Sequence, residues 1–284
     1  MNPLRGLVRR AARRYVTGPR AGDALVAAGR VTERGADVTI GYLNGGDDPP
    51  RRAADAALEA IAAAPVSSRV AIKLPALGTD RGLVDEILGA AADRRLAIHF
   101  DALRPSDADP ILALLAERGD HRSGGEPLGC TLPGRWIRSD SDAEVALELG
   151  LRVRVVKGQF AAPPDAERDP TEGVRSLVDR LAGRVSQVSV ASHDPGLVAD
   201  CAKRLTGAAT PCELELLYGL PTRRVLGVAE GAGLAVRVYL PFGTAYLPYG
   251  LRGADRLRMT ARLIRDVLRP ERSEPLAGLP GGGR

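Results

Sequence analysis

The sequence predicts an α/β protein built as a (βα)8 TIM-like barrel, with helices before the first strand and a final helix over the C-terminal mouth. Eight short apolar segments alternate with longer segments of helical pattern, and successive apolar segments begin 23 to 37 residues apart. Each is interpreted as a strand buried on both faces, as in a parallel sheet. Eight repeated βα units favour a closed barrel over an open sheet. We expect one domain over residues 1–269, including an N-terminal helical arm, and a flexible Pro/Gly-rich tail over residues 270–284.

The elements follow one another in a regular order. Strands are expected at residues 38–43, 70–75, 96–101, 128–132, 151–158, 188–192, 212–217 and 236–240. Helices are expected at residues 51–63, 82–92, 111–118, 140–149, 174–183, 196–205 and 222–230. In the last strand the side chains alternate, so Arg237 and Tyr239 share the face opposite to the valines. A turn at residues 241–243 then leads into the final helix, which carries Tyr249 and Arg252 on one face.

Composition excludes several classes of function. The chain has 284 residues, 44% of them hydrophobic, and a net charge of +5, but its basic residues form no long block outside residues 5–20, which argues against nucleic-acid binding. Three cysteines and three histidines show no metal-ligand spacing, so no metal site is expected. No signal peptide or membrane span is evident, which indicates a cytoplasmic protein, either free or peripheral to the inner face of the membrane. No dinucleotide-binding fingerprint is present, so barrel loops would have to hold any nucleotide cofactor.

Polar residues gather where the expected strands end, which is where barrel enzymes place their active sites. They are Lys73, Asp101, Arg154, Lys157, Ser192, His193, Asp194, Glu213, Glu215 and Tyr239, with Tyr249 and Arg252 on the final helix. The many cations suit an anionic substrate, a phosphate-bearing cofactor, or both. Structural alternatives remain open: Lys73 and Asp101 could form an ion pair that closes the mouth, and Glu213 and Glu215, on one face of their strand, would by default be a surface pair.

These motifs, in this order, resemble the proline dehydrogenases, which are FAD-dependent (βα)8 barrels. The segment VRVVKGQF at 153–160 resembles the family's RLVKGAY, and ELELLYGL…VRVYLPFG at 213–243 resembles its E-x-Q-M-L-x-G…VRVYVPYG. Weaker matches are VAIKLPALG (family K-x-S-A-L-G), FDAL (DAE), ASHD (THN) and YLPYGLRG (Y-x-x-R-R). The resemblance runs from about residue 15 to residue 268 and identifies the chain as a divergent member of this family.

The resemblance implies oxidation of L-proline, or of a closely related cyclic amino acid, to 1-pyrroline-5-carboxylate. Hydride would pass to flavin N5, and a quinone-type acceptor, reached at the membrane surface or elsewhere, would reoxidise the flavin. It implies catalytic roles for Lys73, Asp101, Arg154 and Tyr239. The substrate-binding residues that it implies are Lys73, Tyr239, Tyr249, Arg252 and Arg256. The residues that it implies for FAD are Arg154, Val156, Lys157, Gly158, Ser192, His193 and Glu213.

The sequence departs from the family pattern at both ends of the implied pocket. Where the family has two adjacent arginines, this chain has Arg252 and Gly253, and Arg256, one turn later on the same helical face, is the candidate replacement. Where the family has Q-A-Y after the fourth strand, this chain has residues 133–135, Pro-Gly-Arg. Gln159 and Phe160 replace the Ala and Tyr of the KGAY motif.

Two other functions are left open by the residues themselves. Lys73 or Lys157, at a strand end among other cations, could form a Schiff base in an aldolase-like lyase. The missing arginine and glutamine also allow a non-catalytic barrel that has kept only a binding or regulatory role.

Overall fold

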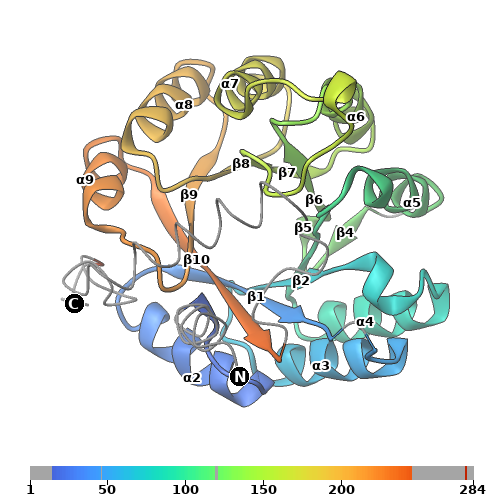
Figure 1. The fold of residues 1–284 in the computed structure, drawn as a ribbon. Helices are drawn as coiled ribbons and strands as arrows, with labels where there is room; N and C mark the ends of the chain where they lie inside the picture. Colours follow the sequence, from blue (N-terminus) through green and yellow to red (C-terminus); the bar gives the residue numbers. More distant parts are fainter. Residues whose placement is uncertain (1–14, 46, 119–120, 245–278, 280–284) are drawn as a thin grey trace, which may run out of the picture.

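The computed structural model describes residues 15–45, 47–118, 121–244 and 279, and it contains a closed barrel of eight parallel strands. Neighbouring strands in the barrel follow the order β1-β10-β9-β8-β7-β6-β3-β2 (Figure 1). Their bounds are β1 Asp37–Leu43, β2 Arg69–Ile72, β3 Ala97–Phe100, β6 Gly129–Pro133, β7 Arg152–Val156, β8 Val188–Ala191, β9 Cys212–Leu217 and β10 Ala235–Gly243. All eight expected strands and the predicted barrel are confirmed.

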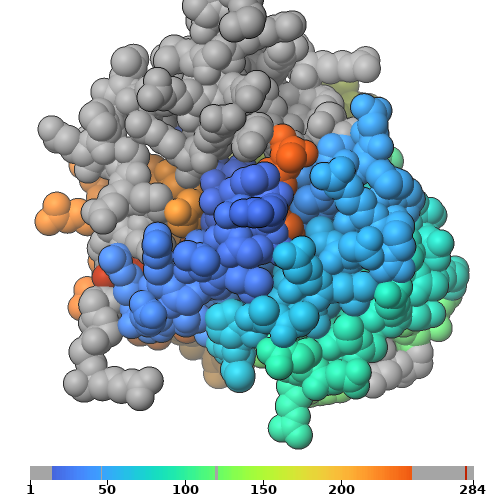
Figure 2. Space-filling view, turned by 90° about the horizontal axis from the view of Figure 1, so that it is seen from below, coloured from blue at the N-terminus to red at the C-terminus, as the bar shows by residue number. Residues whose placement is uncertain are grey.

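Helices surround the barrel; among the described residues, one precedes β1 and the others lie between consecutive barrel strands (Figure 1). They are α2 Ala21–Thr32, α3 Pro50–Ala63, α4 Arg81–Asp93, α5 Pro105–Ala116, α6 Ser139–Glu148, α7 Pro170–Leu181, α8 Pro195–Gly207 and α9 Arg223–Gly231. Figure 2 shows one side of this ring, where α2 and α3 (blue) and α4 (cyan) form a continuous outer surface. The final helix and the tail expected from the sequence lie outside the described residues, except for Leu279, which is buried.

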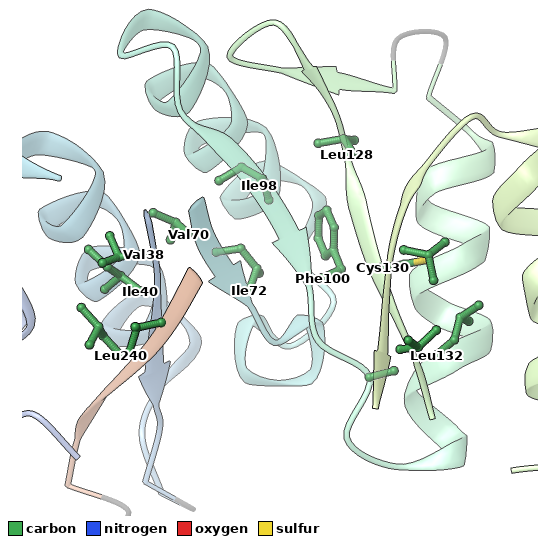
Figure 3. Close-up of a cluster of buried hydrophobic side chains, with 14 of the residues drawn as sticks. Val38, Ile40, Val70, Ile72, Ile98, Phe100, Leu128, Cys130, Leu132 and Leu240 are labelled. Atoms are coloured by element: carbon green, nitrogen blue, oxygen red, sulfur yellow. The ribbon is translucent and has the colours of Figure 1, made fainter. Parts of the chain in front are cut away.

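The apolar core lies between the barrel and the ring of helices. Every second residue of a strand contributes its side chain to this core, as Val38 and Ile40 do on β1 and Ile98 and Phe100 do on β3 (Figure 3). The alternate residues face the inside of the barrel, and many of them are charged. The strands are therefore buried on both faces, as expected, but they are not continuous apolar runs, because the inner face carries charged residues. The inner face of the barrel is held by ion pairs, and its outer face by hydrophobic packing.

Strand β10 is longer than expected. Residues 241–243 form no turn, because Pro241, Phe242 and Gly243 continue in parallel register beside Gly41, Tyr42 and Leu43 of β1. An early segment of the chain binds the same end of β10. The backbone N–H and the hydroxyl of Thr17 both donate to the carbonyl of Pro241, at 2.9 and 3.0 Å, and Gly243 N–H donates to Gly18 at 2.9 Å. These contacts replace the turn and extend the strand.

Two smaller features also differ from expectation. Helix α5 begins at Pro105, before the expected start at residue 111, because the Asp107 carboxylate accepts from the backbone N–H groups of Leu103 and Arg104 and fixes the first turn. A short hairpin, β4 Arg122–Ser123 and β5 Glu126–Pro127, precedes β6. Within the described residues, no helix combines the length and hydropathy needed to cross a bilayer.

Candidate active site at the barrel mouth

Four candidate residues meet inside the barrel, at the end where the strands finish. Lys73 follows β2 and Asp101 follows β3, while Arg154 lies in β7 and Tyr239 in β10. Lys73, Asp101 and Arg154 are 9%, 5% and 4% exposed, so the charged groups of this cluster are almost fully removed from water. Of the four strands that supply these residues, only β2 and β3 are neighbours in the sheet. The closed barrel brings β7 and β10 within reach, because it turns the inner faces of its strands toward one another.

The carboxylate of Asp101 lies at the centre of the cluster. Its Oδ1 accepts from Arg154 Nη1 and, at 3.4 Å, from the Thr131 hydroxyl. Its Oδ2 accepts from the Tyr239 hydroxyl at 2.7 Å and lies 3.7 Å from Lys73 Nζ. The ion pair between Lys73 and Asp101 that the sequence allowed is therefore present, and it is one contact within a larger network.

Lys73 carries a buried ammonium group. Its Nζ donates to the backbone carbonyl of Tyr42 at 2.7 Å and to the Tyr239 hydroxyl at 3.4 Å. Burial lowers the pKa of Lys73 from its ordinary value; Asp101 opposes this shift and the charge on Arg154 adds to it. The network thus holds a lysine whose charged form is less favoured than that of an exposed lysine.

Arg154 is bound by two carboxylates at once. Its Nε and Nη2 donate to the two oxygens of Glu215, each at 2.7 Å, while Nη1 donates to Asp101. Burial opposes the charge on Arg154, but Glu215 and Asp101 outweigh it and raise the pKa of the guanidinium above its ordinary value. The guanidinium carbon also lies 5.2 Å from the centre of the Tyr239 ring, a cation–π distance. Arg154 is therefore a fixed, permanently charged cation.

Tyr239 reaches this network because β1 has a glycine beside it. A Cβ atom on Gly41 would lie 2.1 Å from the Tyr239 hydroxyl oxygen and 2.7 Å from Cζ. Burial raises the pKa of Tyr239 well above its ordinary value of 10, and the charge on Asp101 adds to the shift. The phenol therefore stays protonated and donates to Asp101.

A buried histidine extends the cluster, and the sequence analysis did not single it out. His99 Nε2 lies 2.9 Å from the Thr131 hydroxyl, which in turn donates to Asp101. Burial, with the nearby Arg154, lowers the pKa of His99 well below its ordinary value, so the ring is neutral. Gly129 leaves room for this ring, since a Cβ there would lie 2.3 Å from His99 Nδ1. Strict alternation along residues 97–101, with His99 and Asp101 on one face, is the signal that could have identified it.

Glu213 lies in a separate inner layer and does not join the mouth cluster. Its carboxylate accepts from Arg69, from the Ser189 hydroxyl at 2.5 Å and from Arg237 Nε at 3.1 Å. Glu213 and Glu215 are 2% and 3% exposed, so the default expectation of a surface pair is wrong. The physical reason is that their strand turns this face into a barrel interior supplied with buried arginines.

The remaining cofactor candidates lie around the rim. Lys157 and Gly158 directly follow β7, whose last residue is Val156, and Lys157 Nζ pairs with Asp194 at 3.0 Å. His193 Nε2 accepts from the backbone N–H of Leu217 at 2.9 Å, and the Ser192 hydroxyl accepts from the N–H of Asp194 at 3.1 Å. Tyr249, Arg252 and Arg256 lie outside the described residues, as does Gly253. The described residues contain no group of three or more His, Cys, Asp or Glu that could hold a metal ion.

The donor set at the mouth fits the electron-rich edge of a flavin ring. Arg154 has five N–H groups, and three of them bind Glu215 and Asp101, which leaves two with no hydrogen bond among the described residues. A buried, oriented guanidinium of this kind suits a ligand edge that gains negative charge. Lys157, with a side chain 38% exposed, is a cation at the rim and has the chemistry to bind a phosphate group.

Known proteins similar to this chain include curated relatives and solved structures. No protein-family model matches it. Two curated relatives, both called proline dehydrogenase 1, come from Bacillus subtilis strain 168 and Bacillus subtilis subsp. natto. They are 26% and 25% identical to this chain over 281 residues, and each comparison covers 91% of both proteins.

Solved structures of proline utilization A share the fold. The protein from Bdellovibrio bacteriovorus gives a TM-score of 0.71 at 14% identity, over 96% of this chain and 35% of that one. A mutant of the Bradyrhizobium japonicum protein gives 0.64 at 18% identity, over 93% and 31%. This chain thus spans about a third of the length of these solved proteins, and at such identities the likeness shows the barrel fold alone.

Proposed function

We propose that this chain, a divergent member of the proline dehydrogenase family, is an FAD-dependent enzyme that oxidises L-proline or a closely related cyclic amino acid to 1-pyrroline-5-carboxylate. The observation that carries the proposal is the meeting of Lys73, Asp101, Arg154 and Tyr239 in one buried network. The family resemblance assigns catalytic roles to these four residues.

Arg154 and Lys157 are the residues that would hold the cofactor, Arg154 at the ring edge and Lys157 at a phosphate group. Bound FAD would supply the oxidising power, by accepting a hydride at N5 from the substrate carbon next to nitrogen. A permanently charged guanidinium beside the ring costs no reorganisation when negative charge develops there. The fixed hydrogen bonds of Arg154 to Glu215 and Asp101 supply that preorganisation.

Lys73 would bind the substrate carboxylate as a point charge, and Asp101 and Tyr239 would hold its ammonium in place. The low exposure of Lys73 excludes water, which strengthens its attraction for a carboxylate. Arg252 and Arg256, outside the described residues, stay in the proposal as further partners of that carboxylate.

The test is spectroscopic. The purified protein is expected to show the absorption of bound flavin, as isolated or after addition of FAD, and L-proline added without oxygen should bleach it. If the protein binds no FAD under either condition, the proposal that FAD is its cofactor is wrong. If another cyclic amine bleaches the bound FAD and proline does not, the substrate is that amine and not proline. Reoxidation of the bleached protein by a soluble quinone tests the acceptor.

A Schiff-base lyase remains the second candidate, because burial lowers the pKa of Lys73 and so raises its neutral, nucleophilic fraction. Borohydride treatment with carbonyl substrates should then attach the substrate to Lys73. Lys157, exposed and paired with Asp194, serves as the internal comparison. Absence of any adduct on Lys73 removes this candidate.

A further inference from the structure

Glu215 is a buried carboxylate at the barrel mouth that was not among the catalytic or binding residues expected from the sequence. It lies in β9, is 3% exposed, and gives one oxygen to Arg154 Nε and the other to Arg154 Nη2, both at 2.7 Å. This is the bidentate arrangement that fixes the orientation of a guanidinium most strongly. Asp101, by contrast, divides its oxygens among Arg154, Thr131, Tyr239 and Lys73.

The charge on Glu215 distinguishes this chain from the family motif. Where the motif E-x-Q-M-L-x-G has a neutral glutamine, this chain has Glu215 two residues after Glu213. The four ionised groups of the mouth network are Lys73, Asp101, Arg154 and Glu215, whose charges sum to zero. With glutamine in place of Glu215, the same network would carry a net charge of +1.

We infer that Glu215 is a positioning residue that fixes the plane of Arg154, and that its charge lowers the reduction potential of a flavin bound beside that arginine. Two-electron reduction adds negative charge to the flavin ring, so a nearby cation favours reduction and a nearby carboxylate opposes it. Because both groups are buried, this interaction is weakly screened. The inference rests on the proposed function.

Three variants test the inference in the FAD-loaded, full-length protein, with the midpoint potential of the flavin as the readout. Glu215→Gln is nearly isosteric and still offers one oxygen to Arg154, but it removes the charge; its potential is expected to be more positive than that of the unsubstituted protein. Glu215→Asp keeps the charge and alters the geometry, so its potential should stay close to the unsubstituted value. Glu126→Gln is the control, since Glu126 is 45% exposed and pairs with Arg69 and Arg152, not with Arg154.

The outcomes separate the inference from the proposed function. A positive shift in Glu215→Gln alone supports the inference. An unchanged potential in Glu215→Gln, or an equal shift in Glu215→Asp or Glu126→Gln, overturns it while the proposed function stands. Failure of the unsubstituted protein to bind FAD overturns both.

Discussion

Gly41 leaves the space in which the hydroxyl group of Tyr239 lies. A glycine of β1 therefore allows the side chain of Tyr239 in β10 to donate its hydrogen bond to Asp101. The ideal Cβ position on Gly41 is 2.1 Å from that oxygen, which in turn lies 2.7 Å from Asp101 Oδ2. Tyr239 cannot keep this hydrogen bond if the space is filled.

Gly41→Ala is therefore expected to displace the Tyr239 hydroxyl and to lower the kcat/KM for proline by about tenfold or more, the effect of losing a hydrogen bond to a charged group. Steady-state kinetics with proline measure it. Gly89→Ala is the matched control, because a Cβ on this exposed residue of α4 has nothing within 4 Å; it should leave kcat/KM unchanged and stabilise the helix slightly. Equal kinetics for Gly41→Ala and the unsubstituted protein would contradict the packing argument.

Removal of Arg154 should destabilise the protein strongly. Arg154→Gln removes the cation that binds the buried carboxylate of Glu215, and it leaves Asp101 with Lys73 as its remaining ion-pair partner. Loss of one partner of a buried ion pair costs about 3–5 kcal/mol. Urea denaturation measures the free energy of unfolding. The double variant Arg154→Gln with Glu215→Gln should be more stable than Arg154→Gln alone, because one uncompensated charge is removed. The exposed Arg223→Gln is the control, expected within about 0.5 kcal/mol of the unsubstituted protein. A double variant less stable than Arg154→Gln would contradict the ion-pair network.

The apparent KM for proline should rise in alkaline solution. Burial lowers the pKa of Lys73 below its ordinary value of 10.5, so the ammonium that would bind the carboxylate is lost at a lower pH than in an exposed lysine. In the unsubstituted protein, KM is expected to begin to rise at a pH below 10.5. In Lys73→Arg, where the side chain stays charged, this rise should begin at a higher pH. If KM begins to rise at the same pH in both proteins, the rise comes from the titration of another group.

Acid should destabilise the protein through Glu213. Burial alone would raise its pKa, but Arg237 and Arg69 outweigh burial and lower the pKa from 4.5 to about 2. Because the folded-state pKa is the lower one, the stabilisation is complete above pH 4.5 and is lost as the pH falls toward 2, by about 3 kcal/mol in all. In urea denaturation, the difference between the unsubstituted protein and Glu213→Gln should shrink over this range. The exposed Glu59→Gln serves as the control, with a difference that stays constant.

The strands were predictable because the outward face of each carries an uninterrupted apolar pattern that packs against the helices. The end of β10 was not, because Pro241 and Gly243 resemble turn residues in sequence. Thr17 donates hydrogen bonds to Pro241, and the Gly18 carbonyl accepts one from Gly243; these contacts, with residues more than two hundred positions earlier, keep the end of β10 in the sheet. The local sequence of neither segment predicts such a contact.

The mouth cluster was partly predictable, because family motifs marked Lys73, Asp101, Arg154 and Tyr239. The sequence could not predict which carboxylate pairs with Arg154. Glu213 and Glu215 occupy the same face of β9, and only the three-dimensional register separates their partners. The alternation of Glu with Leu at residues 213–216 was the available signal, and it indicates a strand with one charged, enclosed face once the barrel is assumed.

The hydrogen bonds of Thr17 to Pro241 also bear on how the protein is made. A ribosome makes the other seven barrel strands before β10 appears, so β1 and the segment around Thr17 must wait for their partner until then. Because β10 lies between β1 and β9 in the sheet, a nascent chain that ends before residue 235 cannot close this barrel, and closure has to wait for β10 to emerge.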